Sequence, residues 1–456
     1  MSADTADSAL RSLGYEPSFR RILTRRSLIL YGLVILTPTA PYPVYGIVQQ
    51  MSKGHAALCY LAAMLAMLFT AVSYGRMAGA FPAAGSTYTF VQRGLNAHVG
   101  FIAGWGMILD YIFIPMLSVI YAALTAERLV PRVPYLFWAV LFAVSITWIN
   151  LRGMQQTARA GTVLLWLMSI CAAAFLVLAA LRVAGHGGGG ALLSMQPIFQ
   201  PHEFSLRAVM AGTGVAALSY IGFDAISTLA EDVREPQRDI AVATVAVCVI
   251  QALICVATVY LAALVIPDFR SFANPETVIL DIGQIVGGPW MFGALTLVLL
   301  VAGLASALAG QAAASRLLFG MGRDGVLSRR IFAHVSPGTN TPTRGIWMMG
   351  AAALAGALLV SFQLAVELLN FGAFLGFILV NLSVIQHYYI RGRHRSGWAW
   401  LTNLVAPACG AAACLYIWLS LSSKAQMAGF VWVFIGIIYL AILTRGFRKP
   451  PATLEF

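Results

Sequence analysis

The stretch Ile35–Val48 reads ILTPTAPYPVYGIV, and it lies inside an apolar segment that carries no charge from residue 27 to residue 52. Its middle holds three prolines: Pro38, Pro41 and Pro43. A helix in lipid must satisfy every backbone hydrogen bond, and each proline removes one donor. Irregular backbone survives at membrane depth only where protein or a water-filled cavity covers it. The stretch therefore predicts a broken membrane helix that presents backbone groups to a solute, with an ordinary proline kink or a loop as the alternative.

The composition is that of an integral membrane protein with many helices. Of 456 residues, 60% are hydrophobic and 10% are charged, and the mean hydropathy is +0.81. The first twenty residues are polar and show no cleavable signal, so we expect the first membrane helix to remain as an anchor. The net charge of +12 falls in loops, where membrane topology explains it better than nucleic-acid binding does.

Twelve charge-poor apolar stretches predict an all-α membrane protein with twelve transmembrane helices. These stretches are residues 28–51, 56–79, 99–127, 134–151, 160–181, 208–232, 240–266, 284–315, 345–362, 366–389, 399–421 and 427–444. Most of the 29 lysines and arginines fall in alternate loops when both termini are placed in the cytoplasm. We expect a cytoplasmic tail over 1–26, a ten-helix transport core over 27–395, two further helices over 396–445 and a second cytoplasmic tail over 446–456.

A second irregular segment is expected in the sixth span, where residues 219–224 read SYIGFD. Gly222 weakens a helix, and Asp224 places a carboxyl group within an apolar span. The two interrupted spans are five apart in the chain. Matching breaks in two five-helix halves are typical of an inverted repeat, so we expect a 5+5 inverted repeat with broken helices 1 and 6.

Two carboxyl groups within spans are candidates for function. Asp110 lies 11 residues after Val99, which places it about 16 Å into the third span and near the midplane. Asp110 can bind a cation or form a structural hydrogen bond, and Asp224 can carry a proton or be structural. Glu231 can form an inner gate or lie in a solvated loop. Glu367, at the outer start of the tenth span, is expected at the interface.

Other side chains near the breaks, and several absent motifs, narrow the class. Tyr42, Tyr45, Tyr220 and Phe223 flank the two breaks, where aromatic rings can bind a cation or close over a solute, or simply pack between helices. No nucleotide-binding loop, metal-binding motif or nucleophile motif is present in the sequence, so we expect no enzyme, cofactor or metal. Six cysteines without metal spacing are expected to be small core residues: Cys59, Cys171, Cys248, Cys255, Cys409 and Cys414.

Several motifs together resemble the amino acid–polyamine–organocation permeases across essentially all twelve spans. They are FPAAGSTYTFVQR at 81–93, SYIGFDAISTLAEDVREPQRDI at 219–240 and SRLLFGMGRDGVLSRR at 315–330. Within that family, the segments at 104–116, 37–48 and 370–384 are most similar to bacterial putrescine importers. The resemblance implies the 5+5 inverted repeat, alternating access, and work as a proton symporter or an exchanger. Asp224 falls where some members place a proton-sensing carboxyl group.

The sequence departs from this family in its first break. Amino-acid transporters of the family carry glycines there, whose N–H groups hold a substrate carboxylate; Pro41, Tyr42 and Pro43 replace them here. This change favours an amine without a carboxylate. The putrescine-importer pattern has an acidic residue where Pro43 stands, which leaves Asp110 and Asp224 as the available anions. The family's lysine in the fifth span, which can replace a sodium ion, falls near Met168.

The sequence therefore predicts a proton-coupled secondary transporter in a bacterial inner membrane that imports a small, polyamine-like organic amine. The alternatives are an amino-acid or amine exchanger, a sensor or channel of the same fold, and a subunit that needs a partner protein. The expected partners are the solute, protons and the lipid bilayer. Asp110 and Asp224 are the proton-coupling candidates, and Tyr42, Phe223 and Glu231 are the gate candidates. The candidate substrate-binding residues are Thr37, Thr39, Ala40, Tyr42, Tyr45, Asp110, Tyr111, Ser219, Tyr220, Gly222 and Phe223.

Overall fold

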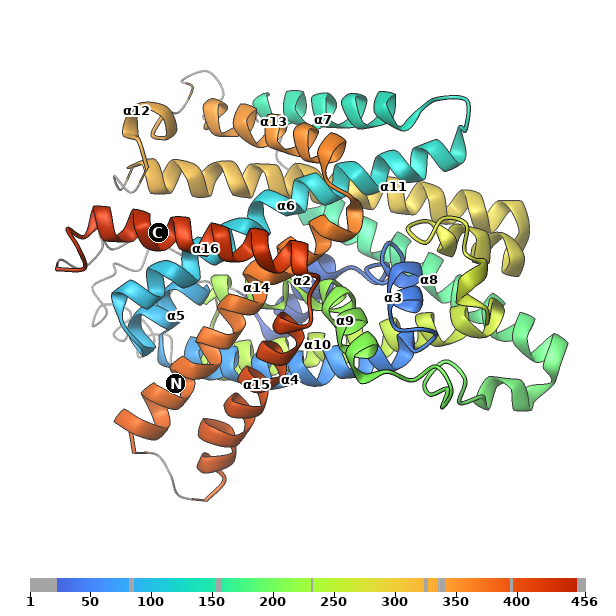
Figure 1. Cartoon of the computed structure of the whole chain (residues 1–456), viewed down its shortest axis with the longest axis horizontal. Coiled ribbons are helices and arrows are strands. Elements are labelled where there is room, and N and C mark those ends of the chain that lie inside the picture. Colours follow the sequence, from blue (N-terminus) through green and yellow to red (C-terminus); the bar gives the residue numbers. More distant parts are fainter. Residues whose placement is uncertain are drawn as a thin grey trace.

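The computed structural model describes residues 23–81, 86–152, 158–230, 233–323, 327–334, 336, 341–393 and 397–448. Within those residues the regular secondary structure is entirely helical, and only two isolated β-bridges occur. Figure 1 shows that many of the helices, α7, α11 and α16 among them, run close to the long axis of the molecule. Among the described residues, nine helices are long and apolar enough to cross a membrane. The predicted all-α membrane class is therefore confirmed.

Each predicted span overlaps helix in the structure. The first span is divided into α2 (Arg25–Leu36) and α3 (Tyr45–Met51), and the sixth into α9 (Leu206–Ala216), η2 (Ala217–Tyr220) and η3 (Phe223–Leu229). Two spans form shorter helices, α7 (Tyr135–Leu151) and α13 (Thr343–Leu359). The remaining spans form α4 (Ala56–Ala80), α6 (Ala97–Leu129), α8 (Ala158–Gly187), α10 (Pro236–Val265), α11 (Val278–Arg323), α14 (Phe362–Val384), α15 (Ala406–Leu419) and α16 (Ser423–Leu443). The number of membrane crossings and the inverted repeat stay predictions.

Several elements lie outside the simple apolar pattern. α11 begins at Val278, earlier than the predicted start at 284, and continues across a kink at Gly288, whose φ is +72°, next to Pro289. π-helical turns extend α14 as η5 (Ile385–Arg391) and precede α15 as η6 (Leu401–Val405). The short connecting elements are α5 (Ser86–Gly94), α12 (Arg329–Phe332), η1 (Gly189–Leu193) and η4 (Phe269–Ser271).

Helix starts follow ordinary capping chemistry. Asn96 accepts a hydrogen bond from the Val99 N–H at 2.9 Å and caps α6. Serine or threonine side chains cap α2, α9, α14 and α16 in the same way. These caps satisfy donors that have no partner within the helix.

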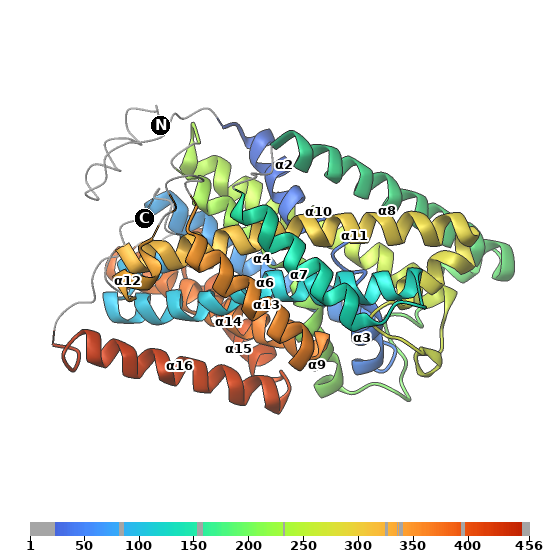
Figure 2. The same cartoon turned by 90° about the horizontal axis from the view of Figure 1, so that it is seen from above.

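The interior of the bundle is built around α6 and α14, whereas α16 lies along one edge (Figure 2). Small residues allow close helix contacts, as is typical of membrane proteins. A side chain on Gly372 of α14 would collide with the Gly106 carbonyl of α6, and one on Gly75 of α4 would come within 2.6 Å of Ala241 in α10. Five of the six cysteines are buried as expected; Cys409 is exposed on α15, so the expectation was wrong there.

Candidate solute-binding site

The break of the first span is a series of tight turns. α2 ends at Leu36, Thr37 adopts a φ of +53°, and turns lead to α3. The N–H groups of Ala40 and Tyr42 donate to the carbonyls of Thr37 and Thr39, at 3.1 and 3.0 Å. The prolines account for the break, because a chain that lacks their N–H groups cannot continue the helical ladder.

The break of the sixth span is much shorter. Tyr220 ends η2, and Gly222 takes a φ of +117°, which side chains strongly disfavour. A Cβ at Gly222 would lie 2.7 Å from Cγ2 of Ile35 on α2. Glycine is therefore required both by the backbone conformation and by the close approach of the first span.

One side chain joins the two breaks. Gln251 of α10 is fully buried, and its Nε2 donates to the carbonyls of Thr37 at 2.9 Å and Ser219 at 3.2 Å. A longer contact of 3.4 Å reaches the carbonyl of Leu36. The amide thus satisfies carbonyls that both helix ends leave without a partner in their own ladder.

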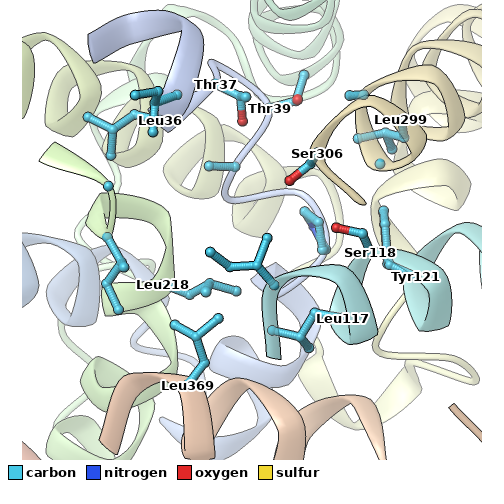
Figure 3. A pocket seen from close by; sticks show the side chains of 18 of the residues that line it. Leu36, Thr37, Thr39, Leu117, Ser118, Tyr121, Leu218, Leu299, Ser306 and Leu369 are labelled. Carbon is cyan, nitrogen blue, oxygen red and sulfur yellow. The ribbon is translucent and has the colours of Figure 1, made fainter. Parts of the chain in front are cut away.

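A cavity of about 270 Å³ lies where these breaks meet α6, α11 and α14 (Figure 3). It is slightly smaller than the roughly 300–1,000 Å³ of sites for drug-sized ligands, which suits a metabolite-sized solute. Most of its wall is apolar. The first span contributes Ile35, Leu36, Thr37, Thr39, Ala40 and Pro43, and the sixth contributes Leu218, Ile221 and Gly222. The helices α6, α11 and α14 supply the rest, including Ile114, Leu117, Leu299 and Leu369.

Asp110 is the only charged side chain among the described residues that line the cavity. It is 6% exposed, and within the described part of the chain its Oδ1 has no hydrogen-bond partner. A carboxylate in an apolar wall is costly unless a cation or a proton donor accompanies it. The site can therefore hold a cationic group at this end.

Asp224 does not line the cavity but follows Gly222, which does, by two residues. It is 8% exposed, and the backbone of Gly222 and Ala225 interacts with its carboxyl group. Asp110 and Asp224 are thus two buried carboxyl groups, one on the cavity wall and one two residues from Gly222 of the same wall. Negative charge on both of them in an apolar interior is unfavourable unless a cation or a proton accompanies it.

Five of the residues predicted to bind substrate line this cavity: Thr37, Thr39, Ala40, Asp110 and Gly222. The other six do not, and their predicted roles are untested. Tyr42 packs against Phe175 with the ring centroids 5.6 Å apart, and Tyr45 packs against Phe272. Tyr111 is half-buried.

The remaining predicted residues lie in the packing around the sixth span. Ser219 and Tyr220 are fully buried, and the Tyr220 hydroxyl donates to the Tyr60 carbonyl at 3.0 Å. The Phe223 ring contacts those of Tyr74 and Phe377. Glu231, a gate candidate, lies outside the described residues.

Sequence reasoning missed the part of the cavity formed by α6 and α11. Asp110, Ile114, Leu117, Ser118 and Tyr121 follow the helical spacing i, i+4, i+7, i+8 and i+11, so they share one face of α6. That spacing was a readable signal once Asp110 was singled out. Ser306 of α11 and Phe362 of α14 had no comparable signal, because one sequence does not reveal which helices meet.

Glu367, which is expected at the membrane interface, is buried inside the protein. Its side chain is 1% exposed within α14. Its two carboxyl oxygens accept hydrogen bonds from Nε2 of Gln363 and from the N–H of Ser422, each at 2.9 Å. Glu367 therefore joins α14 to the start of α16. The two partners are far apart in the sequence, so the sequence alone does not indicate this contact.

These features define a class of protein: a helical, multi-pass membrane protein with a small cavity between two broken helices. The sequence profile of the amino acid permease family matches residues 44–444. The chain belongs to the amino acid permease family, which confirms the resemblance found from its motifs. It is therefore a membrane permease, a secondary transporter of a small solute.

Relatives with different named substrates share nearly the whole chain. The low-affinity putrescine importer PlaP of Escherichia coli K12 is 34% identical over 440 residues, which cover 96% of each protein. The branched-chain amino acid permease BcaP of Bacillus subtilis is 26% identical and covers 95% of each. The methylthioribose transporter of Bacillus subtilis is 25% identical and covers 94% of each. The substrate must therefore be argued from the site.

Proposed function

We propose that this permease imports a small organic amine together with a proton, by alternating access. The observation that carries the proposal is Asp110, a buried carboxyl group at the cavity wall with an unpaired Oδ1. An ammonium group supplies both the charge and the hydrogen-bond donors that this oxygen lacks. The named substrate of PlaP, putrescine, is an amine, which supports the same class.

The break of the first span argues against an α-amino acid. Three of its residues are prolines without an N–H, and the N–H groups of Ala40, Tyr42 and Val44 donate within the break's own turns. These donors are therefore engaged and do not cradle a carboxylate. A substrate carboxylate would also be repelled by Asp110 and Asp224.

The carboxyl pair provides a basis for proton coupling. Asp110 and Asp224 carry up to two negative charges in an apolar region, and one ammonium group balances only one of them. A proton on Asp224 balances the other, so amine and proton stabilise the loaded state together. We assign substrate binding to Asp110 and the proton to Asp224.

The remaining parts of the proposal follow the predicted topology. The transport core comprises residues 27–395, and the last two helices pack beside it. Both termini lie in the cytoplasm of a bacterial cell, and the protein resides in the inner membrane. The bias of lysines and arginines towards alternate loops and the likeness to PlaP support this placement.

Uptake into proteoliposomes tests the proposal. An inwardly directed proton gradient should drive accumulation of a radiolabelled aliphatic amine, and Asp110→Asn should raise its KM at least about tenfold. Asp268→Asn, in an exposed outer loop, is the matched control and should transport normally. Counterflow without any response to the proton gradient would replace symport by exchange. Accumulation of amino acids but not amines would overturn the assigned substrate class.

A further inference from the structure

The cavity has a second polar region, formed by hydroxyl groups at a distance from Asp110. Ser118 of α6 and Ser306 of α11 line the cavity, and Figure 3 shows both hydroxyl groups pointing into it. Thr39 of the first span lies in the same part of the view. These side chains come from three separate elements that all line the same cavity. Between the two polar regions the wall is apolar, with Ile114 and Leu117 on the same face of α6.

We infer that the substrate is an amine with a single positive charge and a neutral hydrogen-bonding group at its far end. This inference rests on the proposed function, because it takes Asp110 as the seat of the ammonium group. Serine hydroxyls donate and accept hydrogen bonds, so they suit a hydroxyl or carbonyl oxygen. Among the described lining residues no second anion faces the hydroxyl region. A second ammonium group there would lose its hydration without gaining a counter-charge, which is strongly unfavourable.

Helix geometry sets the length of such a substrate. Asp110 and Ser118 are eight residues apart on α6, a rise of about 12 Å at 1.5 Å per residue. One hydrogen bond of about 2.8 Å at each end leaves roughly 6 Å between the two polar atoms of the ligand. An extended chain of about four to five carbon atoms covers that gap. The far hydroxyl region thus selects a short amino alcohol or acylated amine over a diamine of the same length.

The two buried carboxyl groups, Asp110 on the wall and Asp224 outside the lining, agree with a single charge on the substrate. Asp110 and Asp224 together offer two negative charges, of which the proton takes one. A doubly charged diamine would need both carboxyl groups, and Asp224 does not line the cavity. The coupled proton and the second ammonium group of a diamine would therefore compete for the negative charge of Asp224.

Three ligands of equal carbon number test this inference: 5-amino-1-pentanol, pentylamine and 1,5-diaminopentane. Their affinities would be measured by calorimetry with the full chain in lipid nanodiscs. We expect the amino alcohol to bind about three- to tenfold more tightly than pentylamine, which lacks the far hydrogen bond. The diamine should bind most weakly. In Ser118→Ala/Ser306→Ala the preference for the amino alcohol over pentylamine should disappear.

A matched control variant separates loss of the far hydrogen bond from a general effect of removing a buried serine hydroxyl. Ser315→Ala removes a buried hydroxyl from the same helix as Ser306, where it donates to the Ala312 carbonyl, and should retain the preference. Tightest binding of the diamine, or a preference that survives the double substitution, would overturn the inference while leaving amine transport intact. Absence of binding by all three amines would overturn the proposed function itself. Thermal melting of each variant against Ser315→Ala separates a lost contact from a lost fold.

Discussion

The two broken helices reach irregular backbone by opposite means. The first break extends from Thr37 to Val44 and is specified by three prolines, which delete hydrogen-bond donors. The second occupies Ile221 and Gly222 and is specified by one glycine with a φ of +117°. The long break supplies four lining residues to the cavity and the short break supplies two. The proline break therefore forms part of the cavity wall. The glycine break brings the first and sixth spans into close contact, and Asp224 follows Gly222 by two residues.

The two breaks can also be compared by the hydrogen-bond partners that their backbone groups use. The first break satisfies many of its own backbone groups through turns. Both breaks nevertheless depend on Gln251, which donates to Thr37 and to Ser219. The two regions are therefore different in sequence but share one support.

Loss of that shared support should have the largest effect. Gln251→Leu removes the side-chain donor to the buried Ser219 carbonyl and leaves the Thr37 carbonyl with the Ala40 N–H of its own turn, so it should lower the free energy of unfolding by about 2–4 kcal/mol. Thermal denaturation in detergent measures the loss. Gln311→Leu is the matched control, since Gln311 donates to Thr147 and to the Ile346 carbonyl away from both breaks. Gln311→Leu should lower the stability of the fold but keep the affinity for the amine. Gln251→Leu should lower both the stability and the affinity. Equal amine affinities in the two variants would contradict a special role of Gln251 at the breaks.

The short break should be intolerant of any side chain. Gly222→Ala imposes a left-handed backbone on alanine, at about 1–3 kcal/mol, and drives its Cβ towards Ile35. We expect a lower melting temperature and weaker amine binding. Gly293→Ala is the reference, because nothing lies within 4 Å of that position in α11. A Gly222→Ala protein as stable as Gly293→Ala would mean that the short break does not need glycine.

The long break should instead tolerate substitution and change selectivity. Pro43 lines the cavity where the importer pattern carries an acidic residue. Pro43→Glu adds a second anion, so affinity for a diamine relative to a monoamine should rise about tenfold, or about 1.4 kcal/mol. Pro43→Gln keeps the size without the charge and should show no such gain. An equal gain in both variants would assign the effect to the lost ring of proline rather than to charge.

The ion pair between Glu203 and Arg270, close to the start of α9, should contribute least. Glu203, shortly before α9, accepts a hydrogen bond from Arg270 at 2.5 Å, and this bond and the Arg270 charge lower the pKa of Glu203 from its ordinary 4.5. Because the folded pKa is depressed, the ion pair stabilises the fold above that ordinary value and is lost as pH falls below it. The pair is exposed, so Glu203→Gln should shift the melting temperature only slightly at pH 7 and not at all at the acid end. A large shift at pH 7 would show that the loops joined by this ion pair stabilise the fold more strongly than their exposure suggests.

The sequence was informative where local chemistry decides the structure. Proline spacing placed the first break, Gly222 placed the second, and apolar runs placed the helices. Residues such as Ser306, Gln251 and Glu367 escaped, because their roles depend on which helices meet in space. Asp110 could be predicted because a carboxyl group in an apolar span is unusual in itself. The cavity wall formed by α11 and α14 could not be predicted in the same way.

A cryo-EM structure of the protein with a bound short-chain amine would test the central claim most directly. We expect ligand density in the cavity between the two breaks, with the amine nitrogen within hydrogen-bond distance of the Asp110 carboxyl group. Density that leaves Asp110 without a contact, or a ligand carboxylate held by the backbone of the first break, would contradict it.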